Sequence, residues 1–406
     1  MTHCLLCGES LLAASTLDLG PLVACNQFEQ YEPSHPQTHP LSITECTVCN
    51  LVQLSRYPPV CFVRPSQPWV RYNEPSAHLG VVLEQLKGLL PIGQIHTAMG
   101  VGPFDEPLLE RLTESSNFIC VQLDMSERLP QEPERYSYLE SMQALLRPEV
   151  LTELASEQGT AKLVSCRYLL EHSHDPVISL RGLSHLMADD GLLLIEVPDS
   201  SKFLNLIDYS FIWEEHICYF TEDTFRSCAL KAGYEIVQFS RYLGALEDAL
   251  VFLLRTSKCV PDQKSVDRTR QNSNTFIRYQ AEFESVQQQY RNALQATSAR
   301  GKKAVIFGAG HQSIMFVNAL GLAQYISYAI DDAPEKIGYL LPGTSIPIVS
   351  SEILARDTSI EICLLGVGPN IEEKIRINFS SYLHRGGLMY TIFPGAGSTT
   401  LVDRKD

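Results

Sequence analysis

The sequence predicts an α/β protein with a small metal-binding module at its N-terminus and two doubly wound α/β domains after it. Short apolar runs alternate with stretches of helical spacing, and this alternation is interrupted and then restarts further along the chain. A pair of Cys-x-x-Cys motifs near the N-terminus predicts the module. We expect the three parts to cover residues 1–70, 71–258 and 259–406.

The composition excludes several classes of protein. A chain of 406 residues with 45% hydrophobic and 19% charged residues is long enough for two or three packed domains and is not a disordered chain. The formal charge of −15 disfavours non-specific binding to nucleic acid or to anionic membranes. No apolar run approaches the roughly 18 residues of a spanning helix, and the first fifteen residues lack a signal-peptide pattern. We therefore expect a cytoplasmic protein whose cysteines are reduced.

The four cysteines of the two N-terminal motifs are candidate zinc ligands. In Cys4-Leu-Leu-Cys7 and Cys46-Thr-Val-Cys49, the spacing lets both sulfurs of each pair face one tetrahedral Zn²⁺. The thirty-eight residues between Cys7 and Cys46 exceed the usual loop of about 15 to 20. A segment this small and poor in periodic runs rarely folds unaided, which favours a structural zinc over the alternative of buried free thiols. Because four thiolates close the coordination shell, this site is expected to stabilise and not to catalyse.

The central part contains a glycine turn typical of a nucleotide-binding α/β domain. Expected strands lie at 95–99, 118–123, 163–166 and 192–197, with a helix near 107–112 after the first strand. The first strand runs into Gly100-Val-Gly102-Pro-Phe-Asp105, and the second ends at Asp124, twenty-two positions after Gly102. Glycines at such a turn allow the close approach of a ligand, and an acid at that strand end can accept hydrogen bonds from ribose hydroxyls. The alternative is an ordinary strand-to-helix turn. The candidate cofactor-binding residues are Gly100, Gly102, Asp105 and Asp124.

An aromatic and acidic segment near residue 216 contains the candidate base. It reads Phe211-Ile-Trp213-Glu214-Glu215-His216-Ile-Cys-Tyr219-Phe220-Thr221. The pKa of about 6.5 of an ordinary histidine suits a general base near neutral pH. Glu214 and Glu215 could orient the ring and stabilise its protonated form. An isolated histidine is more often structural, which remains the alternative.

The C-terminal part repeats the strand and glycine-turn pattern. A Gln-rich stretch at 265–297, free of Pro and Gly, predicts a long amphipathic helix. Strands are expected at 304–307, 325–330 and 362–365, and Gly308-Ala-Gly310-His311-Gln-Ser313 follows the first of them. Asp331 lies twenty-one positions after Gly310, which on paper forms a second dinucleotide fingerprint that lacks the third glycine.

The sequence resembles the three-domain, zinc-containing C-methyltransferases that act on nucleotide-linked keto-deoxysugars, and the resemblance runs almost from end to end. It rests on the paired cysteine motifs followed by Leu51-Val-Gln-Leu54, and on Tyr72-Asn-Glu-Pro-Ser-Ala-His78. It also rests on residues 191–198 before the Glu-His segment and on the Lys-x-Gly-x-x-x-Pro-Gly pattern at 336–343.

The resemblance implies a class I methyltransferase fold for the central domain and a C-terminal Rossmann-like domain that binds the nucleotide sugar. In that family the corresponding segment reads Tyr-His-Glu-His-x-x-Tyr-Phe, and its last histidine is taken as the base. His216 and Glu215 match it, whereas Trp213 replaces the first tyrosine, Glu214 replaces the first histidine, and Ala98 replaces an acid before the glycine turn. The implied catalytic residues are His216, Glu215 and Tyr219. The implied substrate-binding residues are Tyr72, His78, Trp213, Gly308, Gly310, His311, Lys336 and Gly343, with the Gly308 turn and the Lys336–Gly343 segment around the diphosphate.

These observations together predict an S-adenosylmethionine-dependent C-methyltransferase. His216 would remove a proton beside a ketone of the sugar, and the resulting enolate would receive the methyl group. Two alternatives remain: an NAD-dependent oxidoreductase that uses the Gly308 turn, and a non-catalytic nucleotide-sugar-binding protein. We expect no nucleic-acid or membrane partner, and a monomer or weak homodimer.

Overall fold

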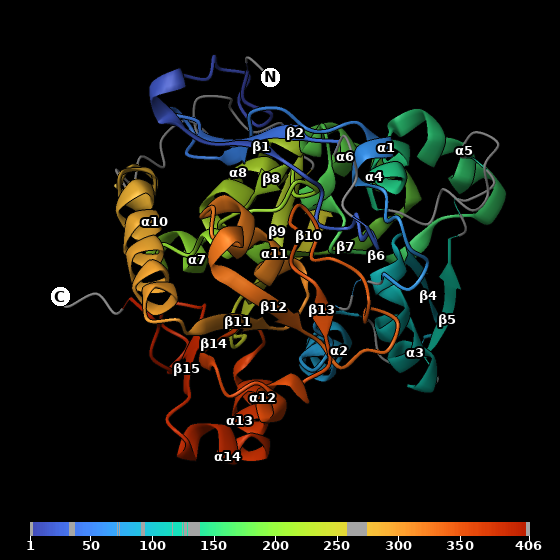
Figure 1. The fold of residues 1–406 in the computed structure, drawn as a ribbon. Helices are drawn as coiled ribbons and strands as arrows, with labels where there is room; N and C mark the ends of the chain where they lie inside the picture. Colours follow the sequence, from blue (N-terminus) through green and yellow to red (C-terminus); the bar gives the residue numbers. More distant parts are fainter. Residues whose placement is uncertain are drawn as a thin grey trace.

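The computed structural model describes residues 3–31, 37–70, 72, 74–90, 94–115, 117–123, 125, 128, 139–257 and 274–402. Within these residues the strands form three sheets, which confirms the α/β class predicted from the sequence. In Figure 1 the blue N-terminal module lies at the top and the red end of the C-terminal unit lies at the bottom. The domain boundaries at 70 and 258 stay predictions. The first sheet crosses the boundary at 70, because three of its strands precede that residue and one follows it.

The first sheet is antiparallel and joins the N-terminal module to the central unit. Its strand order is β1-β2-β3-β8, with β1 at Thr16–Leu22, β2 at His39–Glu45, β3 at Val52–Leu54 and β8 at Cys218–Tyr219. The last strand pairs Val52 with Tyr219 and Gln53 with Cys218. Because β8 belongs to the segment that contains His216, the module is attached directly to the candidate catalytic loop.

The central sheet has the order β5-β4-β6-β7-β10-β9. Its strands are β4 (His96–Gly100), β5 (Phe118–Gln122), β6 (Ala161–Arg167), β7 (Met187–Asp199), β9 (Tyr234–Tyr242) and β10 (Asp248–Thr256). The first four of these are parallel, whereas β10 runs antiparallel to both β7 and β9. After β4 the chain forms β5 on one side of β4 and then β6 on the other side of β4. Ligands of open α/β sheets bind beyond the carboxyl ends of strands at such a switch point.

The helices of the first two units are short and have identifiable end signals. Pro148 is the first residue of α5, and Asp175 caps α6 by accepting a hydrogen bond from the backbone N–H of Ile178. A reciprocal pair of hydrogen bonds between Thr221 and Thr224 starts α8 directly after the His216 segment. The helices are α1 (Val60–Val63), α2 (Leu79–Leu89), α3 (Glu106–Glu114), α4 (Leu139–Met142), α5 (Pro148–Gln158), α6 (Pro176–Leu183), α7 (Ser201–Leu206) and α8 (Glu222–Ala232).

The C-terminal unit is a parallel five-stranded sheet in the order β13-β12-β11-β14-β15. The predicted long helix is present as α10 at Thr275–Ala299, and residues 265–273 of that prediction lie outside the described residues. The strands are β11 (Lys303–Phe307), β12 (Ile326–Ile330), β13 (Ile348–Val349), β14 (Ile360–Leu365) and β15 (Leu388–Thr391). The remaining helices are α11 (His311–Ala319), α12 (Ile353–Arg356), α13 (Pro369–Asn378) and α14 (Ser380–His384).

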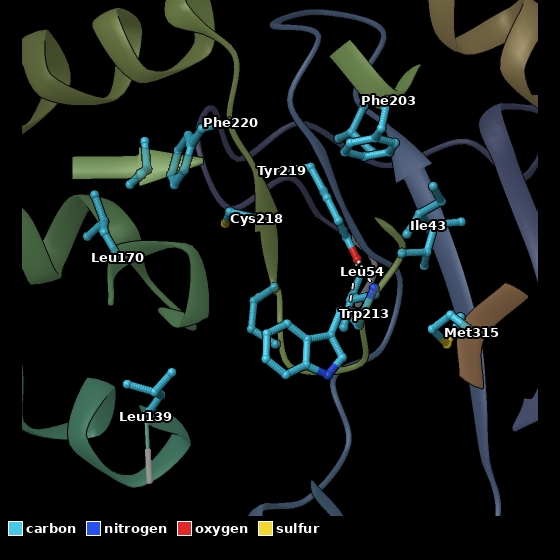
Figure 2. Packing of buried hydrophobic residues seen from close by; sticks show 14 of the residues in the cluster. Ile43, Leu54, Leu139, Leu170, Phe203, Trp213, Cys218, Tyr219, Phe220 and Met315 are labelled. Atoms are coloured by element: carbon cyan, nitrogen blue, oxygen red, sulfur yellow. Dashed lines mark hydrogen bonds between the residues drawn. The ribbon is translucent and has the colours of Figure 1, made fainter. Parts of the chain in front are cut away.

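One buried apolar cluster contains residues from all three units. Ile43 of β2, Phe203 of α7 and Met315 of α11 belong to it, together with Trp213 and Tyr219. Figure 2 shows these side chains around the strand and loop of residues 213–219. The segment that contains His216 is therefore packed at the junction of the units.

In the part of the chain that the structure describes, no helix combines the length and the apolar character that a membrane crossing requires.

Candidate functional site

The two cysteine motifs adopt the same turn. The backbone N–H of Gly8 donates to the carbonyl of Cys4, and that of Asn50 donates to the carbonyl of Cys46, each at 2.9 Å. Gly8 and Asn50 have φ angles of +83° and +60°, a left-handed conformation that glycine and asparagine adopt most readily. Each turn brings the two sulfurs of its motif to one side.

The four sulfurs fit a tetrahedral zinc ion. The Sγ atoms of Cys4 and Cys49 are 3.4 Å apart, as are those of Cys7 and Cys46, and all four lie within 4.8 Å of one another. A zinc ion at about 2.3 Å from each sulfur would require about 3.8 Å between sulfurs. The N-terminal module is further tied to α8, because Lys231 Nζ donates to the carbonyl of Leu6 at 2.6 Å.

The glycine turn after β4 is tightly packed. A Cβ atom at Gly100 would lie 2.6 Å from Gln122 Oε1 and 2.8 Å from side-chain atoms of Asp105 and Leu109, so a larger residue would displace the turn. At Gly102 the nearest atom to such a Cβ lies at 3.6 Å, which leaves ordinary van der Waals space. Gln122 Nε2 donates to the carbonyls of Gly100 and Gly102 and so joins the turn to the end of β5.

Asp105 shapes the turn and does not face the space beyond it. Its side chain is fully buried, and Oδ2 accepts hydrogen bonds from the backbone N–H groups of Val101 (3.0 Å) and Gly102 (2.8 Å). Oδ1 accepts from the Ser165 hydroxyl at 2.5 Å. Burial raises the pKa of the Asp105 carboxyl to about 6. We therefore reassign Asp105 from a cofactor contact to a positioning residue; Asp124 lies outside the described residues.

Tyr219 holds the candidate catalytic loop through the backbone of Trp213. Its hydroxyl donates to the Trp213 carbonyl at 2.9 Å and accepts from the Trp213 N–H at 2.8 Å, as Figure 2 shows. The side chain is buried, and burial raises the pKa of the phenol above its ordinary value. A hydroxyl engaged in this way fixes the loop, so its predicted catalytic role becomes a positioning role.

The two glutamates before His216 are bound by the N-terminal module and its linker. Glu214 Oε1 accepts from the backbone N–H of Cys25 at 2.5 Å. The Glu215 carboxylate accepts from the Tyr72 hydroxyl at 2.9 and 3.0 Å and from the Asn26 side-chain amide. This differs from the expectation that both carboxylates orient the His216 ring. Tyr72 and Glu215 are brought together as predicted residues of one site, whereas Asn26 was missed.

His216 lies among aromatic rings. Its ring centroid is 4.8 Å from that of Trp213 and 5.0 Å from that of His172, which is perpendicular to it. Burial, together with the neighbouring His172 and His311, lowers the pKa of His216 well below its ordinary value. The imidazole is therefore neutral at physiological pH, the form that can accept a proton.

A cavity of about 300 Å³ lies beside His216. His216, Trp213 and Glu171 line it from the central unit, and His311 lines it from the C-terminal unit. Glu74 and Glu247 complete its acidic wall, and burial raises their pKa values to about 7 and about 8. The described residues that line this cavity include no lysine or arginine.

A second cavity of about 190 Å³ lies on the other side of Trp213 and His311, and it reaches Gly310 and Lys336. The rings of Trp213 and His311 are 4.6 Å apart and line both cavities. Lys336 Nζ is held by Asp331 Oδ2 at 2.8 Å and by the Ala309 carbonyl at 3.1 Å.

Lys336 and Gly343, which were predicted to surround the diphosphate together, line two different cavities in the structure. Gly343 lines a separate cavity of about 600 Å³ between β1 and the loop at 340–345. Gly308 has a φ of +98°, and a Cβ there would lie 2.8 Å from the Gly366 carbonyl, so this glycine serves the packing of β11 against β14.

His78 is part of a buried ion network. His78 Nε2 lies 2.8 Å from Glu196 Oε1, and Glu196 also pairs with Arg167. The Arg167 guanidinium donates to the carbonyls of Pro75 and Phe104 as well. His78 and Pro75 thus connect residues 74–78 to β6 and β7. Sequence reasoning missed Arg167 and Glu171, although Arg167 directly follows the predicted third strand and Glu171 lies in the turn after it, where ligand-facing residues of α/β sheets collect.

Known proteins match both large units. A family model for a methyltransferase domain matches residues 100–239, and one for a C-methyltransferase C-terminal domain matches residues 263–394. C-methyltransferase NovU of Streptomyces niveus is 27% identical over 265 residues, which cover 63% of this chain and 63% of NovU. The chain therefore matches less than two-thirds of the length of this relative.

Two solved methyltransferases overlap the chain in part. The 1,6-didemethyltoxoflavin-N1-methyltransferase of Burkholderia thailandensis is 14% identical, with a TM-score of 0.29 over 45% of this chain and 78% of its own. A SAM-dependent methyltransferase of Leishmania major is 12% identical, with a TM-score of 0.30 over 44% and 73%. The two family models match residues 100–239 and 263–394 separately, and with the match to NovU they show that the chain resembles a methyltransferase domain followed by the C-terminal domain of C-methyltransferases.

Proposed function

We propose that this protein is an S-adenosylmethionine-dependent C-methyltransferase that acts on a nucleotide-linked keto-deoxysugar through an enolate. The observation that carries the proposal is the position of His216 in a cavity formed jointly by the methyltransferase unit and the C-terminal unit. A substrate held by the C-terminal unit would thus meet a proton acceptor of the methyltransferase unit.

The turn at Gly100 and Gly102 is compatible with S-adenosylmethionine, because it lies at the carboxyl end of β4, next to the switch point of the sheet, and Gly102 leaves space for close approach. Gly100, Gly102 and Asp124 would hold the cofactor. When bound, it supplies a methyl group on a positively charged sulfur.

His216 would take the proton from the carbon beside the ketone, which leaves an enolate on the sugar. The lowered pKa keeps the ring unprotonated before the reaction. The carboxyl groups of Glu74 and Glu247, when ionised, would favour the imidazolium that forms. The adjacent rings of Trp213 and His311, which are tilted by 34° to each other, would exclude water from the carbanion.

Lys336 and the Gly310 turn would bind the nucleotide part of the substrate. Both line the cavity that shares Trp213 and His311 with the reaction cavity. The sugar would then lie on one side of this aromatic pair and the diphosphate on the other.

The test is incubation with S-adenosylmethionine and a panel of nucleoside-diphosphate keto-deoxysugars, followed by measurement of S-adenosylhomocysteine and of methylated sugar by mass spectrometry. We expect His216→Asn to lower turnover by about 10²- to 10⁴-fold, the usual effect of removing a positioned base, with both ligands still bound. His174→Gln is the matched control, because His174 stacks on Tyr57 at 3.8 Å and does not line the reaction cavity.

Exchange of the substrate proton with deuterated water isolates the first step. We expect wild type to exchange the proton beside the ketone when an unreactive cofactor analogue is bound. Equal exchange in His216→Asn would exclude His216 as the base. Absence of S-adenosylhomocysteine with every sugar, together with NADH binding, would favour the oxidoreductase instead.

A further inference from the structure

Three side chains that could ligate a metal lie together, apart from the four cysteines, and two of them, Glu171 and His216, line the reaction cavity. One carboxylate oxygen of Glu171 and one ring nitrogen each of His172 and His216 lie within 4.8 Å of one another. Glu171 and His172 belong to the 3-10 turn Leu170–His172 after β6, and His216 comes from the loop before β8. Ligands at about 2.1 Å from a shared ion are separated by about 3 to 4 Å, so small side-chain rotations would close the site.

The Glu171 carboxylate is unusual because one of its oxygens is buried without a partner. The side chain is 1% exposed, and Oε2 accepts no hydrogen bond from any described residue. A buried carboxylate oxygen with no donor is costly, and a cation satisfies it without a further side chain. Because Glu171 also lines the acidic cavity beside His216, the unpartnered oxygen belongs to a region that has carboxylates but, among its described lining residues, no lysine or arginine.

His172 is already oriented as a ligand would be. Its ring donates a hydrogen bond to the backbone carbonyl of Glu215. Histidines that bind metals commonly donate one ring N–H to a carbonyl or carboxylate, which fixes the tautomer and the orientation of the ring. His172 is 1% exposed, so little side-chain entropy is left to lose on binding.

We propose that Glu171, His172 and His216 bind one divalent transition-metal ion at the wall of the reaction cavity. Two imidazoles and one carboxylate suit Zn²⁺, Co²⁺ and Ni²⁺ better than Ca²⁺ or Mg²⁺, which prefer oxygen ligands. With three protein ligands the ion keeps open positions toward the cavity, unlike the closed four-thiolate site.

Metal binding and proton transfer compete for the same group. The lone pair of the coordinating His216 nitrogen cannot hold an ion and receive a substrate proton at the same time. This consequence rests on the proposed function: the ion should inhibit methyl transfer, and a chelator should restore it. Binding itself does not depend on that function and can be measured without substrate.

The test is a Co²⁺ titration of the full-length protein after loading with one equivalent of Zn²⁺ under reducing conditions. We expect one further Co²⁺ to bind with visible absorption typical of nitrogen and oxygen ligands. The near-ultraviolet charge-transfer band of a cobalt thiolate should be absent, and its presence would show exchange into the cysteine site.

Two isosteric or near-isosteric variants locate the ion. We expect Glu171→Gln and His172→Gln each to weaken Co²⁺ binding by at least tenfold, whereas the control His174→Gln should bind as wild type does. If either variant shows no melting transition by circular dichroism, the ligands are identified in wild type instead. There, spectroscopic couplings between bound Cu²⁺ and histidine nitrogens show which kind of side chain binds the ion. A failure of the wild type to bind a second ion, or unchanged binding in both folded variants, would overturn the proposal whether or not methyl transfer occurs.

Discussion

Asp105 provides a sensitive test of how the glycine turn is built, because its two simplest substitutions should have opposite effects. The carboxylate accepts three hydrogen bonds while fully buried. Asp105→Asn keeps one oxygen for the N–H groups of Val101 and Gly102, and its new amide can donate to the Ser165 hydroxyl. Asp105→Ala removes the acceptor of the Gly102 N–H and of the Ser165 hydroxyl, whereas the Val101 N–H keeps the Ser165 carbonyl at 3.0 Å.

The expected change in the stability of the turn follows from the pKa of Asp105 and from its hydrogen bonds. Burial raises the pKa of Asp105 from 3.8 to about 6. The folded state therefore binds the proton more tightly, so stability is greatest below pH 3.8 and is lost as pH rises through 6. This difference between the two pKa values corresponds to about 3 kcal/mol of local stability that is lost at pH 8. We expect Asp105→Asn to stabilise the turn by about 1 to 3 kcal/mol at pH 8, and Asp105→Ala to destabilise it by at least about 3 kcal/mol.

The assay is hydrogen exchange of the peptide covering residues 101–112, measured at pH 5 and pH 8 and corrected for intrinsic exchange rates. A local measurement is needed because several packed units rarely unfold in one transition. Wild type should lose protection between the two pH values, and the asparagine variant should not. The reasoning is refuted if wild type and Asp105→Asn show the same change with pH, or if asparagine is as damaging as alanine.

Three further perturbations have defined outcomes. Removal of the proposed zinc by a chelator, verified by elemental analysis, should increase hydrogen exchange at residues 218–219, because β8 pairs with β3 of the N-terminal module. Unchanged exchange at these residues contradicts the coupling. Tyr72→Phe should lower the free energy of unfolding by about 1 to 3 kcal/mol through the lost hydrogen bond to Glu215, and an unchanged urea midpoint counts against it. Lys336→Ala should weaken nucleotide-sugar binding, whereas Asp331→Asn, which releases Lys336, should strengthen it; calorimetry that finds equal affinities dismisses the role.

The sequence predicted those features that depend on neighbouring residues. The central strands β6 and β7 contain continuous apolar runs because both of their faces are buried; the ends of β6 were placed to within two residues, whereas β7 begins five residues before the predicted start. The cysteine motifs were found because each pair is local. The β1–β3 strands were not resolved from the sequence, since the module has few periodic runs, and β8 is only two residues long.

Contacts across long separations could not be predicted. Cys25 and Asn26 bind glutamates 189 positions away, and no local pattern marks such a pair. The same limit explains why Glu214 and Glu215 were expected to serve His216. A carboxylate next to a histidine in sequence points elsewhere when another unit supplies better donors.

The loop from Trp213 to Tyr219 explains why the N-terminal cysteine module accompanies a methyltransferase unit. Two adjacent carboxylates, Glu214 and Glu215, are buried there, at 4% and 1% exposure. Burial without hydrogen-bond donors would be costly, and the donors come from the module and its linker at Cys25, Asn26 and Tyr72. Pairing of β8 with β3 and the hydrogen bonds of the Tyr219 hydroxyl fix the rest of the loop. The N-terminal module thus fixes the loop that contains His216, so removal of the proposed zinc should lower turnover before it abolishes ligand binding.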